Sequence, residues 1–319
     1  MALYTPLPLA EARALAERFD RKAVDVHGIQ GGSVNSNYRL DLDDGSRLFV
    51  RIYEEQDESG ARRDVALARA LVAAGVPTPE PLRTRAGDDI ALHAGKPTAL
   101  VPWVPGTMRC QASVGPEDLH QVGQALARLH LAQLPAAGPG RFEQSGLLAR
   151  CDRIAEGPDP VLSGWADPLR AWLREVQLRR VAACPNGVIH GDLFRDNVLF
   201  DGPTLAAVLD FESASDGPFV FDLAVALLAW CFGDDFEPKL GKALLAGYQS
   251  VRPLDDAERA GLFYEAHFAT LRFAVTRITD YAMRAGDGTN VTKDYRRFLF
   301  RMGRLRKFGP RVFRSTLGL

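Results

Sequence analysis

Residues 190–200 read His-Gly-Asp-Leu-Phe-Arg-Asp-Asn-Val-Leu-Phe, and residues 208–212 read Val-Leu-Asp-Phe-Glu. Asp192 and Asn197 stand on a short loop ahead of an apolar strand, and a second strand ends at Asp210. Phosphoryl transfer from a nucleotide needs a group that accepts or orients the proton of the substrate hydroxyl, and oxygen ligands that hold Mg²⁺ against the phosphates. The spacing therefore predicts Asp192 as the catalytic residue, in contact with the acceptor, and Asn197 and Asp210 as ligands of Mg²⁺.

The sequence on both sides of this loop predicts short strands. Residues 187–190 read as a strand entering the loop, and residues 198–209, with a turn at Asp201-Gly202, read as a hairpin leaving it. We expect the hairpin to bring the three oxygen-bearing side chains to one end of one small sheet. His190 is expected to brace the loop, and Asp222 either caps the apolar helix that it precedes or braces the loop as well.

Composition sets the class of protein. The chain has 319 residues, of which 46% are hydrophobic and 25% charged, which is ordinary for a globular protein of two lobes around a cleft. A formal net charge of -1 gives no bulk reason to expect nucleic acid or a membrane as a partner. The cysteines lack C-x-x-C pairing and no secretion signal is visible, so we expect reduced thiols and a cytoplasmic protein.

Residues 1–103 are predicted to form a nucleotide-binding lobe. A loop rich in Gly, Ser and Asn leads into alternating strands at 38–42 and 48–53, and glycines there let the backbone approach a polyphosphate. Arg51 in the second strand either anchors phosphates, paired with Asp64 on the next helix, or is a surface charge. The residues expected to contact the nucleotide are Gly31, Gly32, Ser33, Asn35, Arg51, Asp64, Leu100, Val101 and Trp103, the last three in a strand that becomes the adenine hinge.

Residues 104–319 are predicted to form a larger catalytic and substrate-binding lobe that is mostly helical. The Gly- and Pro-rich stretch 135–165 is expected to be a surface loop, and Asp167-Pro168 to begin a helix that runs to about Val181. A helix over 271–281 carries two arginines and an aspartate on a broad face. The basic stretch 296–314 is interleaved with apolar residues, which predicts an amphipathic helix with a solvated basic face.

Several of these stretches resemble one family. They are the glycine-rich strand pair, the Ala-Gly-Val-Pro-Thr-Pro run at 74–79, His190-Gly191-Asp192 to Asn197, and Asp210-Phe211-Glu212 through Asp222-Leu223-Ala224. Together they resemble the aminoglycoside phosphotransferase and choline kinase superfamily. Further stretches look like its bacterial homoserine kinases: Asn35-Ser36-Asn37-Tyr38, residues 222–226, Trp230-Cys231-Phe232, Leu245-Ala246-Gly247-Tyr248, residues 251–254 and Leu271-Arg272-Phe273.

The resemblance implies an α+β, bilobal, protein-kinase-like fold, with a small N-terminal lobe built on an antiparallel sheet and a larger helical C-terminal lobe. It also implies ATP, Mg²⁺ and phosphorylation of the L-homoserine hydroxyl in threonine biosynthesis. Two residues depart from the pattern, since Arg195 replaces an expected Pro and Arg51 replaces the commoner Lys. The residues expected to bind the substrate are Asp192, Arg195, Trp230, Arg272, Arg277 and Asp280.

The substrate is expected to be a small molecule, because Asp222 follows Asp210 too closely for a protein-kinase activation loop. Homoserine is a zwitterion, and we expect Arg272 or Arg277 to hold its carboxylate, unless both only form surface ion pairs. Two alternatives stay open. One is another small-molecule kinase of the superfamily, acting on an aminoglycoside, choline or methylthioribose, and the other is an inactive nucleotide-binding relative.

Overall fold

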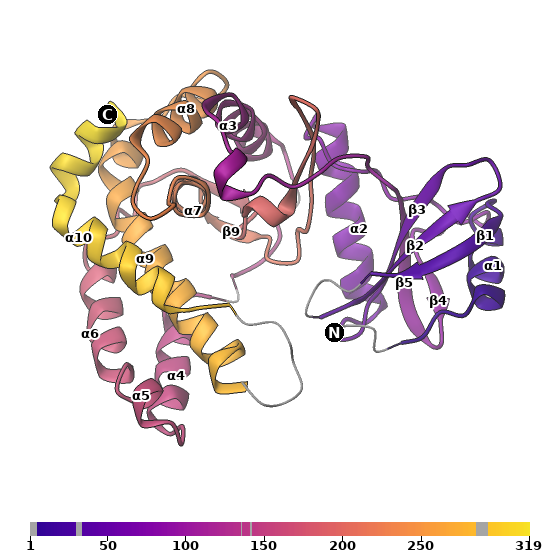
Figure 1. Ribbon diagram of the computed structural model, residues 1–319, viewed down its shortest axis with the longest axis horizontal. Helices are drawn as coiled ribbons and strands as arrows, with labels where there is room; N and C mark the ends of the chain where they lie inside the picture. Colours follow the sequence, from indigo (N-terminus) through magenta and orange to yellow (C-terminus); the bar gives the residue numbers. More distant parts are fainter. Residues whose placement is uncertain (1–4, 30–33, 135, 141, 285–292) are drawn as a thin grey trace. The chain divides into compact units, whose positions relative to one another are not determined.

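The computed structural model describes residues 5–29, 34–134, 136–140, 142–284 and 293–319 (Figure 1). The chain divides into two compact units: unit 1 comprises Met1–Gly106 with Ala206–Val208, and unit 2 comprises Thr107–Leu205 with Leu209–Leu319. Unit 1 contains an antiparallel sheet and unit 2 is mainly helical, so the predicted α+β fold class is confirmed.

The core of unit 1 is a five-stranded antiparallel sheet with the strand order β1-β2-β3-β5-β4 (Figure 1). Its strands are β1 (Ala23–Gly28), β2 (Ser36–Leu42), β3 (Arg47–Ile52), β4 (Ala91–His93) and β5 (Lys96–Pro102). Leu40 and Leu42 in β2, and Leu48, Val50 and Ile52 in β3, are buried at every second position, as a half-buried strand requires. Helix α1 (Leu9–Glu17) packs on β1, and α2 (Glu58–Ala73) contacts β5.

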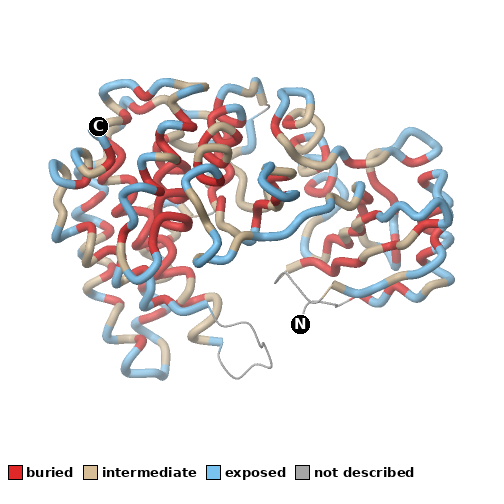
Figure 2. Tube along the Cα trace, turned by 45° about the horizontal axis from the view of Figure 1, so that its top comes forward, coloured by how far each residue is buried: buried red, intermediate tan, exposed pale blue. Residues whose placement is uncertain are grey.

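Unit 2 is built from helices around the apolar helix α7. The helices are α3 (Pro116–Leu131), α4 (Gln144–Ala155), α5 (Pro160–Ser163), α6 (Ala166–Gln177), α7 (Phe219–Trp230), α8 (Pro238–Gln249), α9 (Asp256–Asp280) and α10 (Arg296–Leu317). Every residue of α7 from Val220 to Trp230 is buried, and Figure 2 shows buried residues concentrated along the inner helices. Among the described residues, none of the helices combines the length and hydropathy that crossing a lipid bilayer requires.

Four short strands later in the chain form two sheets, and not the single small sheet that the sequence predicts. β6 (Asn186–Ile189) pairs with β9 (Ser215–Pro218), and β7 (Val198–Asp201) pairs with β8 (Thr204–Val208), so there are two separate two-stranded sheets. The hairpin β7–β8 itself was predicted correctly. β6 instead pairs antiparallel with β9, which follows Asp210, over four consecutive residue pairs from Asn186–Pro218 to Ile189–Ser215.

The prediction of a surface loop over residues 135–165 is wrong, because this stretch contains the helices α4 and α5. Leu147, Cys151 and Ile154 form a buried helical face, while the glycines and prolines that suggested a loop flank α4. α6 begins at Ala166, so Pro168 lies in its first turn as expected, but the helix ends at Gln177 rather than near Val181. All four cysteines are free thiols, as predicted.

Helices α3 and α8 approach each other unusually closely. A Cβ atom added to Gly123 would lie 2.2 Å from the carbonyl oxygen of Leu244, and one added to Gly247 would lie 2.0 Å from that of His120. Real side chains do not tolerate such distances, so both positions need glycine. The two helices therefore touch backbone to backbone.

The buried His267 in α9 predicts acid sensitivity. Its side chain has no hydrogen bond from Nε2 to any described residue, and burial lowers its pKa from 6.5 to about 4, an effect that the charge of Arg306 reinforces and that of Glu175 opposes. As the pH falls from 6.5 to about 4, His267 is protonated in the unfolded chain but still neutral in the folded protein. The folded state therefore loses stability over this pH range. The unfolding free energy of the wild type should therefore drop between pH 7 and pH 4. In His267→Gln this drop should be about 3 kcal/mol smaller, as measured by urea unfolding at the two pH values. Equal losses in the two proteins would contradict this assignment.

Candidate active site

The hairpin β7–β8 holds Asn197 and Asp210 side by side. Asn197 ends the short 3₁₀ helix η2 (Arg195–Asn197) just before β7, and Asp210 follows β8. The backbone N–H of Leu209 donates to the carbonyl oxygen of Asn197 at 2.8 Å, which ties the two positions together. Asp210 has a φ of 64°, a left-handed conformation that is uncommon for a residue with a side chain and that gathers at functional sites.

Asp192 is tied to the same pair. The Asn197 side chain donates from Nδ2 to the carbonyl oxygen of Asp192 at 2.8 Å. The Oδ1 atom of the same amide is then the one available to bind a metal ion. An amide oxygen and the Asp210 carboxylate are hard ligands of the kind that Mg²⁺ prefers. The three residues predicted for catalysis and metal binding therefore lie on one hydrogen-bonded loop system within unit 2, and their chemistry fits a divalent cation.

His190 braces this loop from within. Its Nε2–H donates to the carbonyl oxygen of Leu209 at 3.0 Å, and its Nδ1 accepts the backbone N–H of Asp192 at 3.3 Å. The next residue, Gly191, has a φ of 74°, and a Cβ there would lie 2.7 Å from the carbonyl oxygen of Ser213. The His-Gly pair thus lets the chain turn sharply into Asp192 while it bridges to the strand that precedes Asp210.

Asp222 anchors the same turn from the first turn of α7. Its buried carboxylate accepts the backbone N–H groups of His190 at 2.7 Å and Gly191 at 2.9 Å, and it accepts His130 Nε2–H at 3.2 Å. Burial alone would raise its pKa, but the hydrogen bonds from His130 and from the backbone N–H of His190 hold the pKa of Asp222 below its ordinary value. Of the two roles the sequence left open for Asp222, the structure shows loop bracing, while α7 has Pro218 at its N-cap position.

A buried polar chain extends from Asp222 to α9. Burial lowers the pKa of His130, so its neutral ring donates to Asp222 and accepts the hydroxyl of Tyr248 at Nδ1, at 2.7 Å. Arg252 donates to the Tyr248 hydroxyl at 3.0 Å and to Glu258 at 2.8 Å. The catalytic turn is therefore held by side chains from α3, α7, α8 and the start of α9.

Arg272 in α9 supports Asp192 directly. Its guanidinium donates to the carbonyl oxygen of Gly191 at 2.9 Å and lies 3.5 Å from the Asp192 carboxylate. The same group lies 4.3 Å from the ring centroid of Phe142 and 4.0 Å from that of Phe273. Arg272 is thus largely buried between two aromatic rings and positions the catalytic loop.

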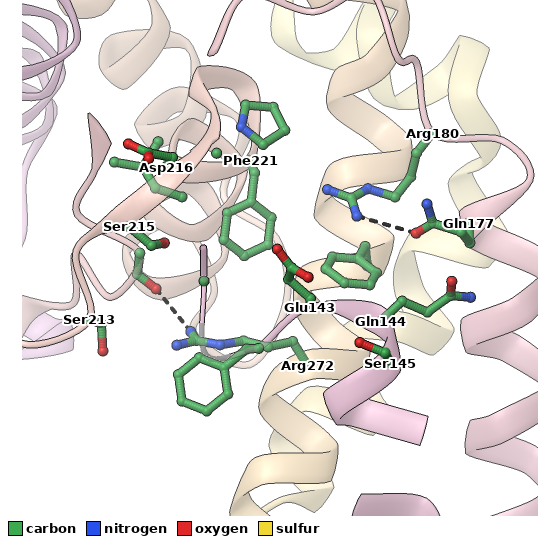
Figure 3. Close-up of a pocket in the computed structure, with 17 residues that line it drawn as sticks. Glu143, Gln144, Ser145, Gln177, Arg180, Ser213, Ser215, Asp216, Phe221 and Arg272 are labelled. Atoms are coloured by element: carbon green, nitrogen blue, oxygen red, sulfur yellow. Dashed lines mark hydrogen bonds between the residues drawn. The ribbon is translucent and has the colours of Figure 1, made fainter. Parts of the chain in front are cut away.

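Arg272 also lines a cavity of 430 Å³ (Figure 3). Gly191 and Arg272 form one wall, residues 213–218 another, and Glu143 points into it from the start of α4. Asp192 is not among the described residues that line this cavity. The cavity therefore borders the backbone of the catalytic loop and not its carboxylate.

The other residues predicted to bind substrate have different settings. The prediction that Trp230 binds the substrate is wrong, because its side chain is 0% exposed. Its indole N–H donates to the carbonyl oxygen of Leu193 at 3.0 Å, so Trp230 supports the loop from the core. Asp280 forms an ion pair with Arg150. Arg195 donates to the side chain of Gln111, and Arg277 donates to the carbonyl oxygen of Asp294 at 2.9 Å.

Unit 1 holds the residues predicted to contact the nucleotide. Arg51 is half-buried in β3, opposite Asn37 in β2 and Ala99 in β5, and Asp64 is half-buried in α2. The prediction that Leu100 contacts the nucleotide is wrong. Leu100 is fully buried in the sheet core, and its carbonyl oxygen accepts the N–H of Leu82 at 2.8 Å.

Six further residues complete the set predicted to contact the nucleotide. Asn35 is buried and accepts the N–H of Glu54 at 3.1 Å, whereas Val101 and Trp103 are partly exposed. Gly31, Gly32 and Ser33 lie outside the described residues.

The sequence analysis assigned no site role to His130, Tyr248, Arg252 or Glu258. No local motif links these residues to the loop, because the link runs through His130, which bonds Tyr248 across 118 positions and Asp222 across 92. The available signal was compositional: a histidine ending an apolar helix and an aspartate inside an apolar run both need buried partners.

Comparisons with known proteins agree with this architecture. The profile of the phosphotransferase enzyme family matches residues 25–261. A protein of Methylobacterium radiotolerans named homoserine kinase is 34% identical over 309 residues, covering 93% of this chain and 94% of its own. Another of that name from Methylocella silvestris is 36% identical and covers 88% of each chain.

The fold also matches solved structures. Spectinomycin phosphotransferase superposes with a TM-score of 0.69 at 12% identity, covering 98% of both chains. These matches span most of the chain and include the loop that carries Asp192, Asn197 and Asp210. The chain belongs to the phosphotransferase enzyme family.

Proposed function

We propose that this protein is an ATP-dependent kinase that phosphorylates the hydroxyl of L-homoserine and yields O-phospho-L-homoserine, a step of threonine biosynthesis. The observation that carries the proposal is the hydrogen-bonded set of Asp192, Asn197 and Asp210, held on one loop system by backbone and amide contacts. Homologues named homoserine kinase, at 31–36% identity over most of the chain, support homoserine as the acceptor.

In the proposed reaction, Asp192 orients the acceptor hydroxyl and takes its proton as the oxygen attacks the γ-phosphorus. Arg272 and the His190 ring hold Asp192 in place, so the carboxylate needs little reorganisation when the hydroxyl arrives. Asn197 and Asp210 would hold Mg²⁺, which neutralises charge on the phosphates when bound. Residues 1–103 are proposed to bind the nucleotide, with Arg51 neutralising phosphate charge, and residues 104–319 to carry the acceptor.

A panel of acceptor alcohols tests the proposal. With ATP and Mg²⁺, ADP release should be stimulated by L-homoserine, and O-phosphohomoserine should form in equal amount. Choline, methylthioribose and an aminoglycoside should give ADP release close to the rate without acceptor. Stimulation by one of these three and not by homoserine would keep the kinase and overturn the acceptor. No stimulation by any acceptor would favour an inactive nucleotide-binding relative.

A further inference from the structure

Four arginines gather around the catalytic loop without a carboxylate partner. Arg195 comes from η2, Arg277 from α9, and Arg297 and Arg301 from α10. Within the described parts of the chain, none of the four forms an ion pair, whereas Arg180 and Arg252 each face a glutamate at 2.8 Å. The charges of Asp192 and Asp196 reach Arg277 without pairing with it. A group of like charges in which no member has a paired carboxylate is unfavourable unless an anion joins it.

Three aromatic rings hold these arginines together. Phe194 on the loop meets Phe273 of α9 edge to face at 4.9 Å, and Phe273 stacks on Phe298 of α10 at 4.8 Å. The guanidinium carbons of Arg277 and Arg301 lie 4.5 and 4.7 Å from the centroid of the same Phe298 ring. The three elements that carry the arginines are therefore packed against one another within unit 2.

Of the four arginines, Arg301 gives the strongest indication of an anion-binding site. It is 8% exposed, its guanidinium lies over the rings of Phe232 and Phe298, and among the described residues it forms no ion pair. Burial, together with the charges of Arg277, Arg195 and Arg297, lowers its pKa to about 9, so it remains a cation at neutral pH. The sequence predicted a solvated basic face for this helix, and Arg301 contradicts that prediction.

The catalytic carboxylate is close to the cluster. The charge of Asp192 acts on Arg277, and Arg195 follows Asp192 by three positions on the same loop. Arg272, the other arginine predicted to bind the acceptor, already holds Gly191 and Asp192. An acceptor whose hydroxyl meets Asp192 can therefore direct an anionic group toward Arg195, Arg277 and Arg301.

We propose that Arg301, with Arg195 and Arg277, binds the carboxylate of an amino-acid acceptor and so determines the specificity of the site. The inference rests on the proposed function, and it assigns the carboxylate to this cluster and not to Arg272. Guanidinium groups suit the role because they bind carboxylates through paired, charge-assisted hydrogen bonds.

The test compares Arg301→Met with Arg311→Met, a control at an exposed arginine of the same helix. Two acceptors are used: L-homoserine, and 3-aminopropan-1-ol, which is homoserine without its carboxylate. Arg301→Met should raise the KM for homoserine about 10- to 100-fold with little change in kcat. Its kcat/KM for 3-aminopropan-1-ol and its KM for ATP should match those of the wild type and of the control.

Thermal unfolding without ligand separates binding from a structural role. Removing an unpaired buried cation should leave the Tm of Arg301→Met unchanged or higher, whereas the loss of a structural arginine would lower it. Arg195→Met, at a half-buried site, repeats the kinetic test if Arg301→Met does not fold. Equal losses for both acceptors, or an effect on the KM for ATP alone, would overturn the inference and leave the proposed function standing. A wild-type enzyme that does not phosphorylate homoserine would overturn both.

Discussion

Asp192→Asn should lower kcat about 10²- to 10⁴-fold, because the amide cannot accept the hydroxyl proton that the carboxylate takes. The change is nearly isosteric, and the backbone contacts of the loop run through the carbonyl oxygen and the N–H of residue 192, so the fold should persist. Steady-state ADP release with homoserine measures the loss. Isothermal titration with a non-hydrolysable ATP analogue should give the wild-type affinity.

Asp196→Asn is the matched control for this change. Asp196 is an exposed carboxylate on the same loop, and its substitution should alter kcat by less than about 3-fold. If Asp192→Asn retained a tenth or more of wild-type turnover, Asp192 would not be the proton acceptor. A comparable loss in Asp196→Asn would move the role to the neighbouring carboxylate.

Asp222→Ala should lower the unfolding free energy by about 3 kcal/mol or more and reduce kcat about 10²-fold. The stability loss follows because the amides of His190 and Gly191 and the Nε2–H of His130 would remain buried without an acceptor. The loss of activity follows because the turn into Asp192 would lose its anchor. Urea unfolding and ADP release measure the two effects.

Asp216→Ala provides the comparison for Asp222→Ala. The Asp216 carboxylate also accepts two backbone N–H groups, from Ala137 at 3.1 Å and Gly138 at 3.0 Å, but it is exposed. Water can replace it there, so its substitution should cost about 1 kcal/mol or less. Similar losses in the two variants would mean that burial of the Asp222 network contributes little. Asp222→Asn, which keeps one acceptor, serves where the alanine variant does not fold.

Local sequence predicted the parts of this molecule whose causes are local. The hairpin around Asp201-Gly202, the alternating strands of unit 1 and the loop from His190 to Asn197 depend on residues within a dozen positions of one another. α4 was missed because composition was averaged over 135–165, which hid a regular apolar face between flanking glycines and prolines. The small sheet was misjudged because β9, the partner of β6, has little strand character of its own.

The settings of single side chains were harder to predict than the elements that carry them. Trp230 was predicted to bind the substrate and Leu100 to contact the nucleotide as part of the hinge strand, yet both are fully buried. Arg301 lies in a helix whose other arginines include exposed ones, yet it is buried with its guanidinium against the rings of Phe232 and Phe298. Whether a charged residue of an amphipathic helix is solvated depends on neighbours that one sequence does not reveal.

The contact between Gly123 and Gly247 has an effect beyond the two helices it joins. His130 lies in the last turn of α3 and Tyr248 in the last turn of α8, so the interhelical spacing that the glycines permit also sets the 2.7 Å between ring and hydroxyl. A single methyl group at either glycine would widen the gap and loosen the grip of His130 on Asp222. Two residues with no side chain thereby govern how firmly the protein holds the turn that leads into Asp192.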